Sequence, residues 1–556
     1  MMQNSLNKSP EKRLLEKRKY MEKVKKPRIS VLDNIITFAI PELEKMDINS
    51  IDAKGSHTPG ERYNGYAMLA VDLYASGWFG YSISPALDWF RIIDSDPRWM
   101  LNEEVNLWMN FVENRLYTIF ENSNFYEIEA LKLRYSPTMG FCTSYMEEDL
   151  STGLPVFKIF HPGKILIMED AHGRASTTLI IDKIQIGDAI ERFGEKNLSA
   201  SLVNAAMNDE YQEWEFCHLV EPNPDQDERS ILNTKFPFRS VWWQSKAEGV
   251  EGIKICRTSG FPFNPYVNWR IRTGTTPYGY GLAEAALVDI MQSNMMTKDL
   301  LMASNKAADP PYNAPIEMQG MVDLRPHGPN YYENPERIVK PFNTGIQYPV
   351  AREEREEVKE VIRQHFHVDF FTLVAQMQGK AMTATQVIEL AGEKAAVISM
   401  PIMKYNYENL EQTFKNIFMI ERKAGRIPPP PAVYGNKQPV VDFIGPLAQA
   451  QRKLFQGRGI QSGIEQSRLI WELRPETMDA IDFDEVQSFI LNTNNFPASA
   501  IVKKEKRDEK RIARAKAEEQ QQRAQAMMTE SATAVNMAKA DKYTGGKITE
   551  SLEAQQ

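Results

Sequence analysis

The chain has 556 residues, of which 42% are hydrophobic and 10% aromatic, with 66 lysines and arginines against 74 aspartates and glutamates. A chain of this length and apolar content is expected to divide into several domains with large cores, which excludes a chain that is disordered throughout. The net charge of −8 argues against a sequence-reading DNA-binding protein, which usually presents a basic face, but it allows a conduit through which DNA slides.

Three features bear on the compartment in which the chain is made. The longest apolar run, residues 35–40, is far shorter than the roughly eighteen residues that a membrane span needs. Residues 1–28 are rich in Lys and Glu without an apolar core, so we expect no secretion signal there. Cys142, Cys217 and Cys256 lie far apart without a C-x-x-C pair, which indicates free thiols of a protein made in a reducing compartment.

The first 55 residues comprise a charged arm, residues 1–30, and a lead-in. The arm is rich in lysine and arginine, which would suit a contact with DNA or an acidic partner. Alternatively it is a solvated, partly disordered terminus, which is the more common outcome for a charge run. We favour the second interpretation.

The next 250 or so residues change from a helical to a strand-rich pattern. Residues 31–135 are predicted to be mostly helical, with an apolar face along residues 102–120 and tryptophans placed in a core. One helix is expected over residues 186–204, among strand-like runs separated by Gly, Pro and Asp turns. These runs are residues 156–160, 164–168, 177–181, 214–220 and 267–271. The pattern predicts an α+β fold.

The middle of the chain has the order helix, compact insert, helix, polar loop, helix. Pro310 and Pro311 end the first helix, residues 282–306, because proline lacks an N–H and disfavours helix at the residue before it. Residues 307–350 form the Pro- and Gly-rich insert. We expect the apolar residues of the first helix to share one face, namely Leu282, Ala286, Leu287, Ile290, Met291, Met295, Leu301 and Met302.

A strongly charged helix is predicted from Ala351 onward. Its charges include Glu353, Arg355, Glu356, Lys359 and Arg363. Glu356–Lys359 and Glu360–Arg363 are expected to pair at i,i+3. The apolar stripe that remains is narrow: Val358, Val361, Ile362 and Phe366. A helix with so little apolar surface faces solvent on most sides, lines a polar cavity, or packs against copies of itself through charges.

Beyond this helix, a short segment rich in Met, Gly and Thr, residues 376–385, precedes a long helix to Ala424. Pro401 lies inside the long helix and is expected to kink it. The segments that follow are predicted as an extended linker, a helical region, a charged lone helix and a disordered tail: residues 425–439, 446–500, 503–528 and 529–556.

Motifs for catalysis are mostly absent from the sequence. Gly-Lys occurs at residues 163, 379 and 546, but never with the upstream glycine of a phosphate-binding loop. Gly279 and Gly281 open a helix but lack the third glycine of a dinucleotide-binding turn. No serine-hydrolase or zinc-protease motif occurs. We therefore predict that the chain is not an enzyme and binds no cofactor.

One alternative remains open from the residues themselves. His365, His367 and Asp369 could supply two imidazoles and a carboxylate to a metal in a nucleic-acid-processing enzyme. Residues i and i+2 of a helix point apart, however, and the preceding segment is strongly helical, so ordinary packing is favoured.

Several short motifs, in order, resemble the portal proteins of short-tailed, podovirus-type bacteriophages, also called head-to-tail connector proteins. The motifs are Pro277-Tyr-Gly-Tyr-Gly281, the helix ending in Lys306-Ala-Ala-Asp-Pro-Pro311, and Lys380-Ala-Met-Thr-Ala-Thr-Gln-Val387 before a long helix. Weaker matches are Trp89-Phe90, Trp269-Arg270, residues 442–452, Asp479–Asp484 and Asn495–Ala498. The resemblance spans residues 56–510, and it is the order and spacing of the motifs that make it specific.

The resemblance implies a portal fold assembled as a ring. Its parts would be a wing, a stem helix, a clip, a return stem helix, a tunnel loop, a kinked wing helix with its linker, a crown and a charged C-terminal helix with a tail. They would occupy residues 56–281, 282–306, 307–350, 351–368, 369–384, 385–445, 446–502 and 503–556.

The resemblance also implies roles for particular residues. The tunnel loop would face DNA with Met377, Gln378, Gly379, Lys380, Met382 and Thr383. Flexible methionines and small residues suit a loop that deforms around a moving rod. The clip would present a docking surface with Pro310, Pro311, Arg325, Tyr331 and Tyr332.

The implied function is a ring of twelve subunits at one capsid vertex, which nucleates head assembly and forms the channel for packaging and ejecting double-stranded DNA. Its implied partners are the terminase large subunit, then tail adaptor or nozzle proteins, and the major capsid and scaffold proteins, with no membrane. The protein would be found in the virion, and in the host cytoplasm during assembly. A scaffold or tail protein without a channel is a further alternative.

Overall fold

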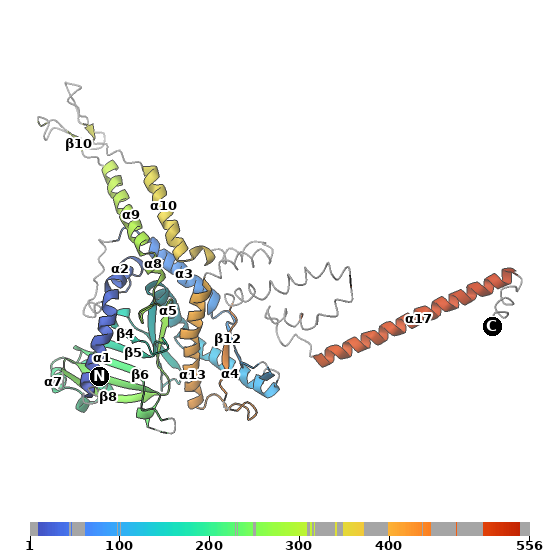
Figure 1. The fold of residues 1–556 in the computed structure, drawn as a ribbon, viewed down its shortest axis with the longest axis horizontal. Coiled ribbons are helices and arrows are strands. Elements are labelled where there is room, and N and C mark those ends of the chain that lie inside the picture. The colour runs from blue at the N-terminus through green and yellow to red at the C-terminus, as the bar shows by residue number, and fades with distance from the viewer. Residues whose placement is uncertain are drawn as a thin grey trace. The chain divides into compact units, whose positions relative to one another are not determined.

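We describe the fold from a computed structural model (Figure 1). It describes residues 9–43, 62–96, 98–99, 102–227, 232–247, 252–308, 348–371, 398–435, 437–445 and 504–544, and the isolated positions 46, 230, 312–313, 316, 340–341, 474 and 487. The chain separates into two units, residues 1–459 and 460–556, which are treated one at a time.

Antiparallel sheets organise the first unit. A five-stranded sheet runs in the order β4 (Ile165–Met168), β5 (Thr177–Gln185), β6 (Glu213–Pro222), β7 (Phe238–Ser245) and β8 (Ile253–Phe261). A three-stranded sheet places β2 (Phe141–Glu148) between β3 (Pro155–Ile159) and β9 (Tyr266–Arg270). Two small ribbons pair β1 (Phe90–Ile93) with β12 (Val440–Phe443), and β10 (Tyr312–Asn313) with β11 (Lys340–Pro341).

This mixture of helices and antiparallel strands confirms the α+β prediction. All five predicted strands are present, as β3, β4, β5, β6 and β9. Five further strands, β1, β2, β7, β8 and β12, were not predicted from the sequence. β1 and β12 are only four residues each and pair over a separation of more than 300 residues, so no local pattern reveals them.

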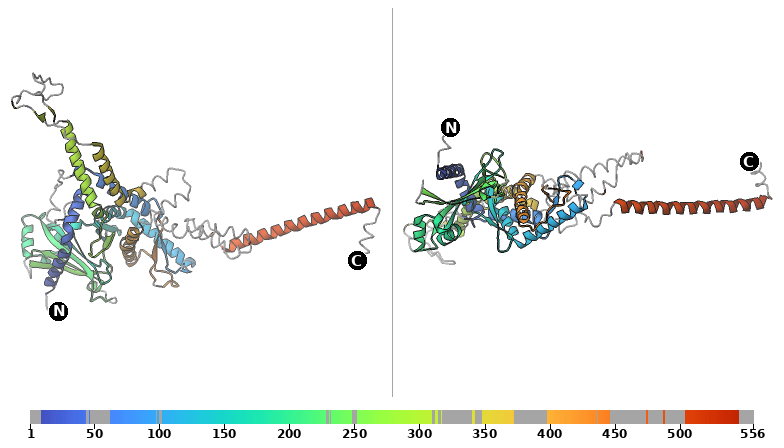
Figure 2. Two further views of the ribbon diagram at one scale, coloured as in Figure 1. Left: turned by 45° about the horizontal axis from the view of Figure 1, so that its top comes forward. Right: turned by 90° about the horizontal axis from the view of Figure 1, so that it is seen from below.

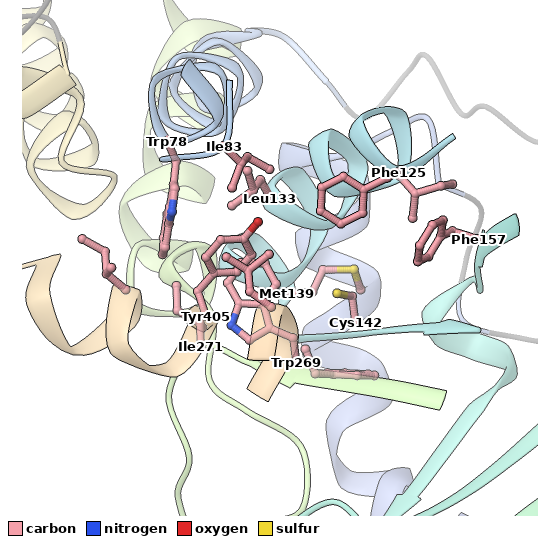
Figure 3. Packing of buried hydrophobic residues seen from close by; sticks show 14 of the residues in the cluster. Trp78, Ile83, Phe125, Leu133, Met139, Cys142, Phe157, Trp269, Ile271 and Tyr405 are labelled. Atoms are coloured by element: carbon pink, nitrogen blue, oxygen red, sulfur yellow. The ribbon is translucent and has the colours of Figure 1, made fainter. Parts of the chain in front are cut away.

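The main core lies between the three-stranded sheet and the helices α3 (Tyr66–Ser82), α4 (Glu103–Asn122) and α5 (Phe125–Met139). Trp78 of α3 meets Trp269 of β9 and Tyr405 edge-on, with ring centroids 5.8 and 5.6 Å apart (Figure 3). The apolar face predicted for residues 102–120 is confirmed, since its large side chains are buried. The aromatic residues therefore form core, as expected.

The charged N-terminal arm is folded, so the prediction of a solvated terminus is wrong for residues 10–28. Residues Pro10–Lys25 form α1, which is capped by the Ser9 side chain and lies across one face of the five-stranded sheet (Figures 1 and 2). Leu14 and Met21 are buried against that sheet. A 3-10 turn, Lys26–Arg28, joins α1 to α2 (Ile29–Ala39).

Two basic residues of α1, Lys17 and Arg18, are paired with carboxylates of the sheet, which local charge alone does not reveal. Arg18 donates to Glu215 at 2.7 Å, and Lys17 pairs with Glu221. Lys25 is buried, and its ammonium donates to the carbonyls of residues 162, 163 and 165 at 2.6 to 2.8 Å. Burial lowers the pKa of Lys25 to about 7.

Two predicted helices prove to be interrupted. The helix expected over residues 186–204 is split into α6 (Ile186–Phe193) and α7 (Ala200–Ala206), because Gly194 adopts φ +79° and ends α6. The long helix around Pro401 is described from Ile398. It changes to a π-helix over Tyr405–Leu410 and continues as α13 (Glu411–Lys423). The kink expected at Pro401 stays a prediction, because residue 397, whose carbonyl the proline ring would meet, lies outside the described residues.

The Pro-rich segment after α13, residues 425–439, is bound by residues at the edge of the main core. The indole Nε1 of Trp108 donates to the Pro428 carbonyl at 3.0 Å. The Tyr434 hydroxyl donates to Asp94 at 2.5 Å, and its ring lies 5.7 Å from that of Trp108. The expectation of a plain extended linker over residues 425–439 is therefore wrong, because aromatic side chains far away in the sequence bind it.

In the second unit, α17 (Lys504–Thr544) is a single long helix with exposed or half-buried side chains wherever they are described. The predicted lone helix is confirmed, but the disordered tail is wrong as far as residue 544, since the alanine-rich sequence favours continued helix. Residues 446–502, apart from positions 474 and 487, lie outside the described part of the chain. Among the described helices, none combines the length and apolarity needed to cross a membrane.

Candidate functional site

The candidate site is the pair of helices α9 (Leu287–Ala308) and α10 (Tyr348–His365), which lie side by side and lead away from the sheets (Figures 1 and 2). A short helix, α8 (Leu282–Ala285), precedes α9, with a break at Ala286. The predicted first helix is therefore interrupted near its start. The second begins three residues earlier than expected, at Tyr348.

The glycines of the Pro277–Gly281 motif fix the root of this pair by close packing. Gly279 and Gly281 pass so near residues 138–140 that a Cβ on either would overlap a backbone carbonyl oxygen there. Gly140 has φ +102°, and a Cβ on it would overlap the Gly279 carbonyl. The motif therefore supplies a backbone-to-backbone contact that only glycine permits.

The tyrosines of the same motif anchor it from both sides. Tyr278 is buried, and its hydroxyl accepts from the backbone N–H of Ile167 at 3.2 Å. The guanidinium of Arg28 lies 4.6 Å from the ring centroid of Tyr280 and donates to the Gly279 carbonyl at 3.0 Å. Arg28 also binds both carboxylate oxygens of Glu284 in α8, each at 2.7 Å. The root of the pair is thus a rigid part of the core.

One face of α9 packs inward with polar as well as apolar groups. Ile290 is buried, and the Asn294 side chain accepts from the backbone N–H of Tyr63 at 2.7 Å. Asn64 donates to the hydroxyls of Ser293 and Thr297, at 3.1 and 3.2 Å. These bonds fix the segment before α3 against the middle of α9.

The opposite face of α9 is apolar and exposed. Val288 is 75% exposed, Met295 64% and Met302 52%, and Met291 lies on the same side. At 100° per residue these four positions fall within about 60° of one another. We call Val288, Met291, Met295 and Met302 the α9 stripe. Two charged residues lie beside it: Asp299, which is exposed, and Lys298, whose ammonium lies 5.4 Å from the ring centroid of Tyr63.

The expectation that all apolar residues of this helix share one face is therefore wrong. Leu282, Ala286 and Ile290 are buried, whereas Met291, Met295, Leu301 and Met302 are exposed. The break at Ala286 changes the direction in which the later side chains point relative to Leu282. Ile290 and Met291 are adjacent, so their side chains point about 100° apart. The sequence signal for two faces was the presence of polar Ser293, Asn294 and Thr297 opposite the methionines.

The charged helix α10 has the narrow apolar stripe that was predicted for it, with one exception. Ile362 and Phe366 are buried and Val358 is half-buried, so the narrow stripe exists except at Val361, which is 39% exposed. Glu356 accepts from Lys359 at 2.7 Å and from Arg355 at 3.2 Å. These neighbours lower the pKa of Glu356.

The remaining charges of α10 divide into paired and exposed groups. Arg363 donates to Asp369 at 2.6 Å and lies 3.6 Å from Glu360. Glu353, Glu354 and Glu357 are exposed and form no ion pair with any residue that the structure describes. The outward surface of α10 is therefore acidic.

The three residues of the alternative metal site do not converge in the described structure. His365 lies 3.6 Å from Asp289, and Asp369 is bound by Arg363. His367 has φ +51°, and its Nε2 is buried without a hydrogen-bond partner in the described part of the chain. Burial and nearby Arg272 lower the pKa of His367 to about 4. The described residues contain no group of three metal-binding side chains.

Phe371 is the last described residue before most of the predicted tunnel loop. Its ring packs edge-on against Tyr74 of α3, with centroids 5.5 Å apart, and lies against Gly77, where a Cβ would collide with it. The DNA-facing residues expected from the resemblance lie outside the described residues: Met377, Gln378, Gly379, Lys380, Met382 and Thr383. So do the clip residues Pro310, Pro311, Arg325, Tyr331 and Tyr332.

Comparison with known proteins decides the family. The chain matches the family described as bacteriophage head to tail connecting protein over residues 11–502. The chain belongs to this family. It is 25% identical over 482 residues to the portal protein of Salmonella phage epsilon15, covering 83% of this chain and 82% of that protein. It is 25% identical over 427 residues to the probable portal protein of Bordetella phage BPP-1, covering 75% of each. The resemblance noted from the motifs is confirmed.

Proposed function

We propose that the chain is a phage portal that assembles into a ring of twelve subunits at one capsid vertex. Genomic DNA passes through the axial channel of this ring during packaging and ejection. The α9–α10 pair is the stem, and the predicted clip docks the terminase large subunit and later the tail adaptor. Family membership supports the role, and the α9 stripe supports self-assembly.

The observation that carries this proposal is the stripe itself. Four large apolar side chains stay exposed on a helix whose other face is packed against the body. Contiguous exposed apolar surface marks an interaction site. A ring subunit presents two different surfaces to its two neighbours, so an unpartnered stem face is what such a subunit needs.

The first test changes the stripe. Met295→Glu would place a charge in the buried contact, so we expect at least a roughly tenfold lower fraction of rings in native mass spectrometry, with a folded monomer by circular dichroism. Met207→Glu is the matched control, because Met207 is 82% exposed at the end of α7. Normal rings from Met295→Glu would contradict the proposed stem contact.

A second test addresses the channel. Lys380 of the predicted tunnel loop would form a sparse positive collar when repeated around a ring. Lys380→Glu is expected to reduce packaged DNA per head while leaving ring assembly unchanged. An assembly defect with normal packaging in the surviving heads would show instead that this segment is structural.

A further inference from the structure

The outer face of α3 is a second surface without a partner in the described structure. Leu69 is 52% exposed and Leu73 44% exposed, and the small residue Ser76 is also exposed. Gly80 continues the same row, and a Cβ on it would meet nothing within 4 Å. With spacings of four, three and four residues, these positions form one face about 16 Å in length. We call them the α3 face.

The remaining sides of α3 are already occupied. Tyr74 and Trp78 are buried in the main core. On one flank Asp72 pairs with Arg134 of α5, and on the other Gly77 receives Phe371. The α3 face therefore lies opposite the core and carries no charge. A helix that is apolar on nearly all sides is normally buried, and none of the described residues covers this face.

The chemistry of the α3 face limits what can cover it. Two leucines, a serine and a glycine offer no cation to a phosphate backbone, so nucleic acid is not its partner. The hydroxyl of Ser76 is compatible with an apolar contact, because a helical serine can bond the carbonyl four residues before it. The small residues at 76 and 80 let a second helix approach closely and leave room for long side chains. Methionine suits such a surface, because it is apolar and adapts to irregular gaps.

The first part of the α9 stripe, nearest the start of α9, is apolar and lies beside the start of α3. Val288, Met291 and Met295 are apolar, whereas Asp299 follows one turn further out. Asn64, two residues before α3, is hydrogen-bonded to Ser293 and Thr297 of the same α9. The start of α3 and this stretch of α9 thus lie at the same level within one subunit.

We propose that the α3 face of one subunit receives Val288, Met291 and Met295 of α9 from the next subunit. The inference rests on the proposed ring, in which each interface joins two different patches of the same chain. It assigns those two patches: the α9 stripe is the donor surface and the α3 face is the acceptor surface. Apolar burial between them is the driving force.

A cross-linking experiment tests this pairing. Leu73→Cys and Met295→Cys are made as separate full-length proteins and assembled together, so that a 73–295 disulfide can form only between subunits. The native cysteines Cys142, Cys217 and Cys256 are buried, so they should contribute little background. We expect a disulfide-linked dimer from the mixture under mild oxidation and none from either variant alone. Leu73→Cys mixed with Met207→Cys is the matched control.

The outcomes separate this inference from the proposed function. Rings that form without the 73–295 dimer overturn the pairing and leave the portal proposal standing. A protein that forms no ring of any kind overturns both. As a second measurement, Leu73→Glu should lower the ring fraction at least about tenfold, whereas Leu107→Glu, at an exposed leucine of α4, should not. Equal ring fractions in the two variants would also overturn the pairing.

Discussion

The body of the first unit and the α9–α10 pair use charge and apolar surface in opposite ways. In the body, the Glu129 carboxylate is fully buried and binds Lys132, Tyr405 and Asn409 at 2.6 to 2.9 Å. In the α9–α10 pair, the carboxylate of Glu356 is half exposed, and large apolar side chains of α9 face outward. One region completes its contacts within the chain, and the other completes them with a neighbour only in the proposed ring.

This difference separates the positions where substitution is costly for folding from those where it affects assembly. Substitutions in the body should act on the stability of the single chain. Substitutions on the outward faces of α9 and α3 should leave the chain folded and change its association. Paired variants, one in the body and one at an exposed position, test this difference.

The largest effect is expected for Glu129→Ala. It would leave the Lys132 ammonium buried without its carboxylate, which costs about 3–5 kcal/mol for a buried pair. The exposed counterpart, Glu356→Ala, should cost less than about 1 kcal/mol, because solvent screens the pair. Thermal unfolding followed by circular dichroism measures both. Similar losses for the two variants would break the contrast between the regions.

A smaller but clear effect is expected from glycines. Gly281→Ala would push a methyl group into the Thr138 carbonyl, and the rigid root can relieve this only by a backbone shift, at a cost of about 3 kcal/mol. Gly80→Ala, on the open α3 face, should instead stabilise the chain by about 0.5–1 kcal/mol through lower backbone entropy. Chemical denaturation measures both changes. A neutral Gly281→Ala would mean that the root is not rigid.

The smallest effect at neutral pH is expected at His367. Its pKa in the folded chain is about 4, below the ordinary value of 6.5, so between these values the unfolded chain binds a proton that the folded chain does not. Stability should therefore fall as the pH drops from 6.5 to 4. His367→Asn removes this titration and tolerates φ +51°, so its unfolding temperature should fall less over that range. Equal pH profiles would rule out His367 as the source.

Local patterns in the sequence sufficed for much of the fold and for part of the site. The strands β3 to β6 and β9, the face of α4 and the charged surface of α10 all follow from spacing and residue type. The α1 helix was missed because its partners, Glu215 and Glu221, lie about 200 residues away. The two-faced nature of α9 was missed because its phase depends on the break at Ala286, which apolar spacing alone does not reveal.

The roles of the Pro277–Gly281 residues also depend on contacts that the local sequence does not reveal. The motif pointed to a family, but its glycines act through contacts with residues 138–140, and nothing in the motif names that partner. The exposed face of α3 was also hidden in the sequence. A largely apolar helix predicts burial, and only the folded chain shows which side remains uncovered.

The position of α1 has a consequence for the order of events during synthesis. α1 is complete at residue 25, yet it packs on a sheet whose last strand ends at Phe261. At about 5–20 residues per second, the ribosome needs roughly 12–50 s to make the intervening chain. Until β6 is made, the nascent helix carries Lys17 and Arg18 without Glu221 and Glu215, the sheet carboxylates that later bind them. Docking of α1 must therefore wait until the sheet has been made, well after the helix itself is complete.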